Sequence, residues 1–394
     1  MNLHISIPHT DWHLKIFILT FCFFPITTMS QDKKPSLLDI EFNVIADVVN
    51  IHQGSQDVHN GKTLFLGLEQ LGVSINPFRE VGNRTLLHFN ILNAHGAMPS
   101  ENYIGDLQIA SNIEAGNYIG LFEAYLEQTY NNHSIRIGQL DLNGAFLYTD
   151  PALYFSNSSF GIMPSVSCNV GCSIYPISAL GFIYRYSHKS ITLQIGLYDG
   201  DPGSVEDNNF NLQPSLSEKQ GLLSITEAQY NFVGKLNGSV KLGSFFHSAN
   251  FLPFEDSENI YRSNYGGYIL YEQSLGLTKL KSSKYNFFIK GGFAPSDRNF
   301  ISSFAGVGIV VNSLLNIFDE DQLGIAFAQA YISKALRNMQ PVYDNSETSI
   351  ELFYGFTFLK HFSIQPSIQY IVNPGALKTN SDALISLFRF QASL

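Results

Sequence analysis

The sequence predicts an all-β protein: a 16-stranded antiparallel transmembrane β-barrel with a long inward-folded loop, preceded by a signal peptide. Three observations lead to this fold class. Apolar and polar residues alternate along many stretches of the chain. Charged residues are scarce, while aromatic residues are abundant. Short and long connections alternate between the predicted strands, as they do in transmembrane barrels.

The alternation is clear in the stretch LFEAYLEQTYNNHSIRIGQL at residues 121–140, which resembles a strand, a tight Asn-Asn turn and a second strand. We expect one apolar face, made of Phe122, Ala124, Leu126 and Tyr130 and continued by Ile135 and Ile137. The opposite face then carries polar and charged side chains: Glu123, Tyr125, Glu127, Thr129 and Arg136.

The composition fits a β-protein with an apolar outside and a polar inside. Charged residues make up 14% of the chain, against roughly 25% in ordinary globular proteins. Aromatic residues make up 13%, yet the mean hydropathy is only +0.02, which argues against a helical membrane protein. The net charge of -10 and the lack of a Lys/Arg cluster give no support to nucleic-acid binding.

The first element is a predicted signal peptide at residues 1–30, which leaves a barrel domain at residues 31–394. Lys15 precedes the short apolar run IFILTFCFF, and the small residues Thr28 and Ser30 suit cleavage before Gln31. After residue 30, no stretch reaches the ~18 apolar residues that a membrane-spanning helix needs.

Sixteen strands follow, judged from alternation and from bounding Gly, Pro, Asn, Asp and Ser residues. Their lengths suit tilted strands that cross a bilayer, which need ~9–11 residues. We expect them at 38–50, 62–72, 83–94, 118–130, 133–141, 179–187, 190–198, 221–232, 238–248, 262–273, 285–293, 303–311, 321–333, 347–358, 362–372 and 382–393.

The connections between these strands give the second signal for a barrel. Three are short, at 131–132, 187–189 and 359–361, and two are of middling length, at 274–284 and 312–320. The long ones are 142–178, 199–220, 249–261 and 334–346, and the early segment 104–115 is interpreted as a loop.

The apolar face must look towards lipid if sixteen strands close. A barrel of that size encloses a lumen too wide for side chains to fill, and an apolar lumen would be unstable in water. The polar face of each strand therefore lines a water-filled lumen. The alternative is a soluble two-sheet sandwich, which has no reason to alternate short and long connections.

Several stretches together resemble the OprB family of carbohydrate-selective porins from Gram-negative outer membranes. They keep their order and cover most of the chain after residue 30: GDLQIASNIEA, LFEAYLEQTY, FSNSSFGIMPSV, YPISALG, GLYDGDP, GGFAPSDRNFIS, DQLGIAFAQAYIS, IELFYGF and IQPSIQYIVNPG. The resemblance implies a sixteen-stranded barrel through which small sugars diffuse down their gradient. It also implies contact with outer-membrane lipid and lipopolysaccharide, and it leaves a homo-oligomer open.

Two features depart from the family pattern. The chain ends in Leu394, whereas outer-membrane proteins usually end in an aromatic residue. The pair Cys168 and Cys172 is not one that we associate with the family. In an oxidising compartment this pair predicts a disulfide.

The predicted substrate path combines the longest loop, 142–178, with the polar wall beside it. In porins a loop at this place folds inward and narrows the pore. Its aromatic rings suit the apolar faces of sugars, and charged wall groups suit hydroxyls. The candidate residues are Glu123, Tyr125, Glu127, Arg136, Arg84, Arg185, Glu227, Tyr148, Tyr154 and Phe155, and the further inward charges are His88, Glu351 and Arg389. Alternatively, the aromatic rings only pack the loop onto the wall, and the charges only keep the lumen wet.

No cofactor, metal site or catalytic residue is predicted. A lone cysteine pair is too little for zinc, and the acidic tips at 254–259 and 318–322 fit no calcium loop. The rival functions are an outer-membrane hydrolase and an adhesive or structural barrel. Neither a nucleophile motif nor a carboxylate pair for glycoside hydrolysis supports the first rival.

Overall fold

The computed structural model describes residues 36–54, 60–204, 208–234, 236–254, 260–276, 284–314, 318 and 320–394. The predicted signal peptide lies outside these residues. Among the described residues, no helix is both long and apolar enough to cross a membrane.

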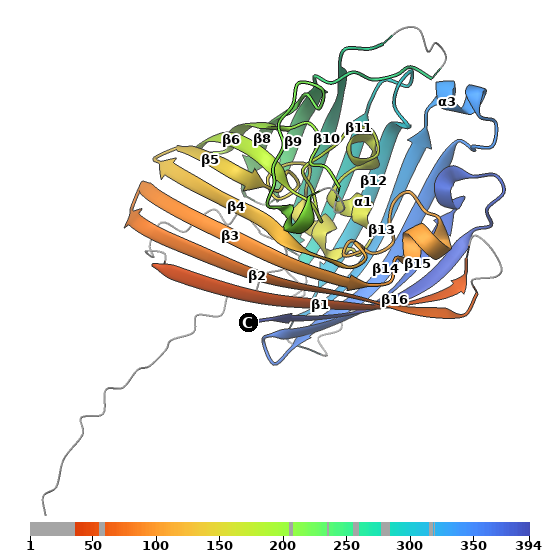
Figure 1. Cartoon of the computed structure of the whole chain (residues 1–394). Coiled ribbons are helices and arrows are strands. Elements are labelled where there is room, and N and C mark those ends of the chain that lie inside the picture. Colours follow the sequence, from red (N-terminus) through yellow and green to blue (C-terminus); the bar gives the residue numbers. More distant parts are fainter. Residues whose placement is uncertain are drawn as a thin grey trace, which may run out of the picture.

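Sixteen antiparallel strands form one closed barrel in which each strand pairs with its neighbours in the chain and β1 pairs with β16 (Figure 1). The strands are β1 (Leu38–Gln53), β2 (Lys62–Glu80), β3 (Asn83–Gly96), β4 (Tyr118–Tyr130), β5 (His133–Leu140), β6 (Ala179–His188), β7 (Ile191–Asp199), β8 (Leu222–Phe232), β9 (Asn237–His247), β10 (Asn264–Gly276), β11 (Lys284–Phe293), β12 (Ile301–Asn312), β13 (Glu320–Ile332), β14 (Ser346–Phe358), β15 (Phe362–Val372) and β16 (Ala383–Ser393). All sixteen predicted strands are confirmed.

Short helices lie in the connections at one end of the barrel. They are the π-helix η2 (Ser100–Ile104), the 3-10 helices η3 (Asp150–Tyr154), η4 (Asn209–Asn211) and η5 (Pro374–Ala376), and the α-helices α1 (Ser158–Gly161), α2 (Pro164–Ser167) and α3 (Lys334–Met339). The connections at the other end hold no described helix, and several are two or three residues long. The predicted alternation of short and long connections is therefore confirmed.

Side-chain burial follows the predicted two-residue period. On β7, Leu193 is 47% exposed, whereas its neighbour Gln194 is 8% exposed. The apolar residues on this outer face have only solvent or lipid beside them, while the polar ones face other parts of the protein. The apolar faces of the strands thus form the outer wall, as predicted.

One residue of the stretch at 121–140 was assigned to the wrong face. Phe122 is only 6% exposed and packs edge-on against Tyr175, with the ring centroids 6.2 Å apart. The cause is a bulge in β4: Asn90 pairs with Glu123 and the next residue of β3 pairs with Leu121, which leaves Phe122 as an extra residue. The extra residue turns the Phe122 ring into the barrel.

The second strand is longer than predicted: it was expected to end at residue 72 but continues to Glu80. Pro77 lies at a register shift between Ile75 and Phe78, where the ladder does not need its missing N–H. At the other end of the chain, the ladder reaches the last residue: the backbone N–H and C=O of Leu394 both bond to Phe42. The final residue therefore helps to close the barrel although it is not aromatic.

Candidate functional site

The long loop, residues 141–178, lies inside the ring of strands, where Figure 1 draws α1. Its backbone is held by charged side chains from the inner wall. The carboxylate of Glu351, on β14, accepts hydrogen bonds from the backbone N–H groups of Ser156 (2.9 Å) and Asn157 (3.0 Å) and from the Ser156 hydroxyl (2.7 Å). Hydrogen bonds to a charged group contribute about 1.5–3 kcal/mol each. Glu351 thus fixes the middle of the loop.

Two lysines on β9 and β11 hold other points of the loop. Lys241 on β9 donates to the carbonyl of Tyr148 at 2.9 Å, and its ammonium also lies 4.0 Å from the centre of the Tyr148 ring. Lys290 on β11 donates to the carbonyl of Phe160 at 2.6 Å. Because these lysines bind loop carbonyls, their charges are turned towards the protein and not towards the open lumen.

An aromatic cluster fills the space between the loop and the wall. Phe155 is 1% exposed, and its ring centroid lies 4.9 Å from Phe160, 5.8 Å from Phe288 and 5.0 Å from Phe353. Edge-on and tilted ring pairs at these separations stabilise packing beyond simple burial. Phe155 therefore holds the loop in place, and our expectation that its ring faces a passing sugar was wrong. For this residue, the packing interpretation is the correct one.

A second segment, residues 97–117, also lies against the inner wall, which the sequence did not lead us to expect. The carboxylate of Glu347 accepts the backbone N–H groups of Leu107 (2.8 Å) and Gln108 (2.9 Å). Ser111 donates to Asp47 at 2.7 Å. Two loops, not one, narrow the lumen.

Asp47 belongs to a buried ion pair that joins the first and last strands. Its carboxylate accepts two hydrogen bonds from the guanidinium of Arg389, both 2.8 Å long. Arg389 also donates to the Asn112 side chain at 2.8 Å. The same pair therefore connects β1, β16 and the second inward segment.

Three of the predicted path residues form one group on β4 and β5. The Arg136 guanidinium lies 2.6 Å from the carboxylate of Glu127, and its carbon atom lies 4.5 Å from the centre of the Tyr125 ring. Arg84 donates to the Asn76 side chain at 2.7 Å.

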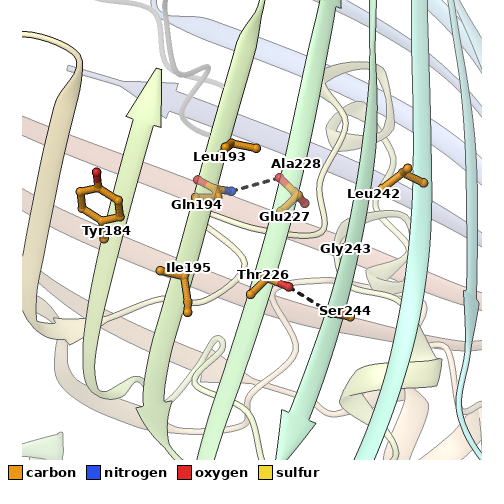
Figure 2. Close-up of a pocket in the computed structure, with 10 residues that line it drawn as sticks. All are labelled: Tyr184, Leu193, Gln194, Ile195, Thr226, Glu227, Ala228, Leu242, Gly243 and Ser244. Carbon is orange, nitrogen blue, oxygen red and sulfur yellow. Dashed lines mark hydrogen bonds between the residues drawn. The ribbon is translucent and has the colours of Figure 1, made fainter. Parts of the chain in front are cut away.

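Arg185 and Glu227 are both linked to Gln194. Arg185 donates to the Gln194 oxygen at 3.0 Å. The Gln194 nitrogen in turn donates to Glu227 at 3.0 Å (Figure 2). Glu227 also accepts from the Leu147 backbone N–H (3.3 Å) and the Tyr268 hydroxyl (3.0 Å). Glu227 is thus a further anchor of the long loop. The hollow in Figure 2 opens on the outer side of the wall, between exposed residues such as Leu193.

A cavity of about 490 Å³ lies between the long loop and the inner wall. Of the predicted path residues, Glu123, Tyr148 and Tyr154 line it. Its other walls are rich in amides, carboxylates and hydroxyls: Glu41, Asn43, Gln70, His88, Asn90, Asp141, Asn143, Asp150, Gln322, Ser363, Gln365 and Gln391. The cavity suits a small, hydroxyl-rich solute.

The predicted disulfide is wrong in this structure, because Cys168 and Cys172 are both free. Cys168 ends α2 with an exposed side chain, whereas Cys172 is buried and donates to the Val170 carbonyl at 3.1 Å. Burial raises the pKa of Cys172 to about 12, so its thiol stays protonated. Within the described ranges, no three His, Cys, Asp or Glu side chains are grouped to hold a metal.

Comparison with known proteins identifies the family. The model of the carbohydrate-selective porin, OprB family, matches residues 70–394. The chain belongs to the OprB family. Porin B of Pseudomonas aeruginosa is 21% identical over 390 residues, which cover 87% of this chain and 84% of that protein.

Solved structures share the fold. The high-pH structure of Pseudomonas putida OprB superposes with a TM-score of 0.80 at 18% identity and covers 91% of this chain and 94% of its own. OmpT of Vibrio cholerae, in its trimer form, gives a TM-score of 0.54 at 9% identity and covers 91% of this chain and 99% of its own. As an OprB-family porin, the chain is a protein of the Gram-negative outer membrane.

One charged group of this OprB-family cavity should titrate near neutral pH. Asp141 follows β5; burial, and then the charge of Glu123, raise the pKa of Asp141 to about 8, although Arg136 opposes this shift. As the pH rises through about 8, Asp141 loses its proton and adds a negative charge to the cavity. We therefore expect the preference for cations over anions, measured from reversal potentials in a salt gradient, to increase between about pH 7 and about pH 9.

The matched control is Asp141→Asn, which keeps the oxygen that accepts the Asn143 backbone N–H at 3.0 Å. This variant should lack the increase and should behave at high pH as the native protein does at low pH. An equal increase in both proteins would assign the titration to another group.

Proposed function

We propose that neutral mono- and disaccharides diffuse through this porin by way of the cavity between the long loop and the inner wall. The lining of the cavity carries the proposal: the rings of Tyr148 and Tyr154 lie beside many amide and carboxylate groups. Aromatic rings suit the apolar faces of a sugar, and the polar groups suit its hydroxyls.

Charge pairing along the lumen supports a neutral solute. Arg136 is paired with Glu127, and Arg389 with Asp47. Paired opposite charges leave a local transverse field that orients dipolar solutes without attracting one sign of net charge. The electric field of the Glu127–Arg136 ion pair and the ring of Tyr125 would then act on a passing sugar. These three residues lie outside the lining of the cavity.

The proposed activity is passive diffusion without chemical change, which the porin family and fold support over an enzyme. Liposomes that contain the purified protein should swell in isosmotic glucose or maltose, faster for the smaller sugar, and the sugar recovered from inside should be intact. Protein-free liposomes are the control. Absence of swelling would contradict the channel, and recovery of hydrolysed sugar would favour an enzyme.

We also propose that the outer wall contacts outer-membrane lipid and lipopolysaccharide, and that the chain forms a homo-oligomer. The apolar outer faces of the strands support the first part. The trimer form of the structurally similar OmpT supports the second.

A further inference from the structure

Basic and aromatic side chains gather on the outer face of the barrel, where β5 and β6 meet their short turns. Ile135 on β5 is exposed, so His133, the outward position before it, also points away from the lumen. On β6, Tyr186 pairs with His133 and shares this outer face. Lys189, in the turn between β6 and β7, is exposed. We call this group the imidazole cluster, and its members are Asn132, His133, Tyr184, Tyr186, His188 and Lys189.

Ring contacts and hydrogen bonds hold the imidazole cluster together. The centroid of the His133 ring lies 5.1 Å from that of Tyr186 and 6.0 Å from that of Tyr184. Nδ1 of His133 lies 2.8 Å from the Tyr184 hydroxyl. The His188 ring stacks on Tyr186, with the centroids 6.4 Å apart. The amide nitrogen of Asn132 lies 2.9 Å from Nδ1 of His188. The two imidazole rings are therefore held in fixed places on the outer face.

The contact with Asn132 determines where His188 carries its proton. An amide nitrogen can only donate, so Nδ1 of His188 accepts this hydrogen bond and the proton of the neutral ring lies on Nε2. No hydrogen bond joins Nε2 to any residue that the structure describes. Along the described residues of β4 to β8, no Asp or Glu side chain is exposed on this outer face. His188 and the Lys189 ammonium thus offer donors to an anion from outside the protein.

A hollow of about 490 Å³ in the outer wall adjoins the imidazole cluster (Figure 2). Tyr184 belongs to both, because its hydroxyl contacts His133 and its side chain lines the hollow. Small side chains from β8 and β9, among them Thr226, Ala228 and Ser244, line its middle. The hydroxyls of Thr226 and Ser244 lie 3.0 Å apart and bond to each other, so they need no water. The larger apolar residues beside them are Leu193, Ile195 and Leu242.

The hollow and the cluster lie in the part of the wall near the short turns. Leu193 is close to Ile191, where β7 begins, and Ala228 is close to Phe232, where β8 ends. The short turns of transmembrane barrels are periplasmic, so this part of the wall faces the inner leaflet. In a Gram-negative outer membrane, that leaflet consists of phospholipids, whereas lipopolysaccharide lies in the outer one. The lipid beside the hollow therefore has a phosphodiester at the level of the cluster.

We propose that the imidazole cluster and the hollow bind one phospholipid of the inner leaflet, with its phosphodiester at His188 and Lys189 and an acyl chain along the hollow. A phosphodiester is an anion that accepts hydrogen bonds from imidazole and ammonium donors. An acyl chain fills the hollow and gains dispersion contacts with its apolar sides. Tyr184 and Tyr186 lie at the headgroup level, as aromatic residues of barrels do. The inference rests on the proposed lipid contact and identifies one site within it.

Native mass spectrometry of the purified porin with added phosphatidylglycerol tests the headgroup half of the site. The native protein should retain one lipid, and His188→Leu with Lys189→Ser should lower the retained fraction about tenfold, because two donors to a charged group are lost. The matched control is Lys360→Ser with His361→Leu, which removes the same two side-chain types at another short turn. There, the His361 ring donates to the backbone carbonyl of Ser393 at 3.1 Å. Equal retention by the two double variants, or no lipid on the native protein, would overturn the site.

A second variant tests the hollow. Ala228→Phe places a ring where the acyl chain lies and should also lower retention of phosphatidylglycerol. The matched control is Ala305→Phe, at an exposed outward position of β12, which should retain the lipid. Inorganic phosphate in millimolar excess should not displace the lipid, because phosphate has no acyl chain. Displacement by phosphate, or full retention by Ala228→Phe, would overturn the role of the hollow.

Two further readouts separate this site from the other proposals. The heat-modifiable shift on gels verifies that each variant forms a barrel. Lipid retained in equal amounts by all variants would leave the general lipid contact of the outer wall in place and defeat the specific site. In liposome swelling, variants that admit sugar while retaining lipid equally defeat only the site. A protein that retains lipid selectively but admits no sugar defeats only the channel.

Discussion

Deletion of residues 152–174 is expected to raise single-channel conductance several-fold and to abolish the block of ion current by sugar. Sixteen strands alone enclose a wide aqueous channel. In this porin, the deleted segment fills part of that channel and is fixed to the wall by Glu351 and Lys290. Planar-bilayer recordings with and without maltose measure both effects. A heat-modifiable shift on gels verifies that the barrel still assembles.

A milder variant separates removal of the loop from loss of its attachment. Glu351→Ala leaves the buried N–H groups of Ser156 and Asn157 without an acceptor, which costs about 1–3 kcal/mol for each group. The loop should then detach part of the time and give a noisy current of intermediate conductance. Glu351→Gln keeps one acceptor oxygen and should stay closer to the native protein. Unchanged conductance and sugar block after the deletion would mean that the loop lies off the solute path.

Arg389→Met is expected to lower the free energy of unfolding by about 3–5 kcal/mol, the usual cost of breaking a buried ion pair at one partner. The reason is that Asp47, 0% exposed, keeps its charge but loses both hydrogen bonds from the guanidinium. Urea-induced unfolding in detergent micelles, followed by far-ultraviolet circular dichroism, measures the loss of unfolding free energy.

Two comparisons identify the cause of that destabilisation. The double variant Asp47→Asn with Arg389→Met removes the uncompensated carboxylate charge and should recover much of the lost unfolding free energy. Arg185→Met removes a lumen arginine whose hydrogen-bond acceptor, Gln194, is neutral, and should cost less. Equal destabilisation by the single and double variants would show that packing, and not the uncompensated charge, is responsible.

The strands could be predicted because each repeats one simple pattern, apolar outward and polar inward, over about ten residues. The pattern also identified Glu351 and Arg389 as inward charges. It failed at Phe122, because a bulge inserts one residue without any mark in the sequence. It also ended the second strand at residue 72, whereas the strand continues past a register shift after Ile75 to Glu80.

The partners of the inward charges could not be predicted. Alternation places Glu351 on the lumen side, but only the fold brings it to Ser156, which is 195 residues away in the chain. The same holds for the segment 97–117, whose attachment to Glu347 depends on β14 lying opposite it. These parts of the candidate site therefore depend on contacts between distant parts of the chain, for which a single sequence carries no local signal.

The pairing of β1 with β16 makes this porin a ring that the chain can complete only at its last residues. Asp47 and Arg389 are 342 residues apart, and Leu394 itself bonds to Phe42. Bringing such distant segments together has a large entropic cost and slows folding. Until they meet, two strand edges carry unpaired N–H and C=O groups that lipid cannot satisfy. The sheet must therefore stay protected until the last strand is available, and a chain cut short before residue 383 would remain an open sheet with no lumen to conduct.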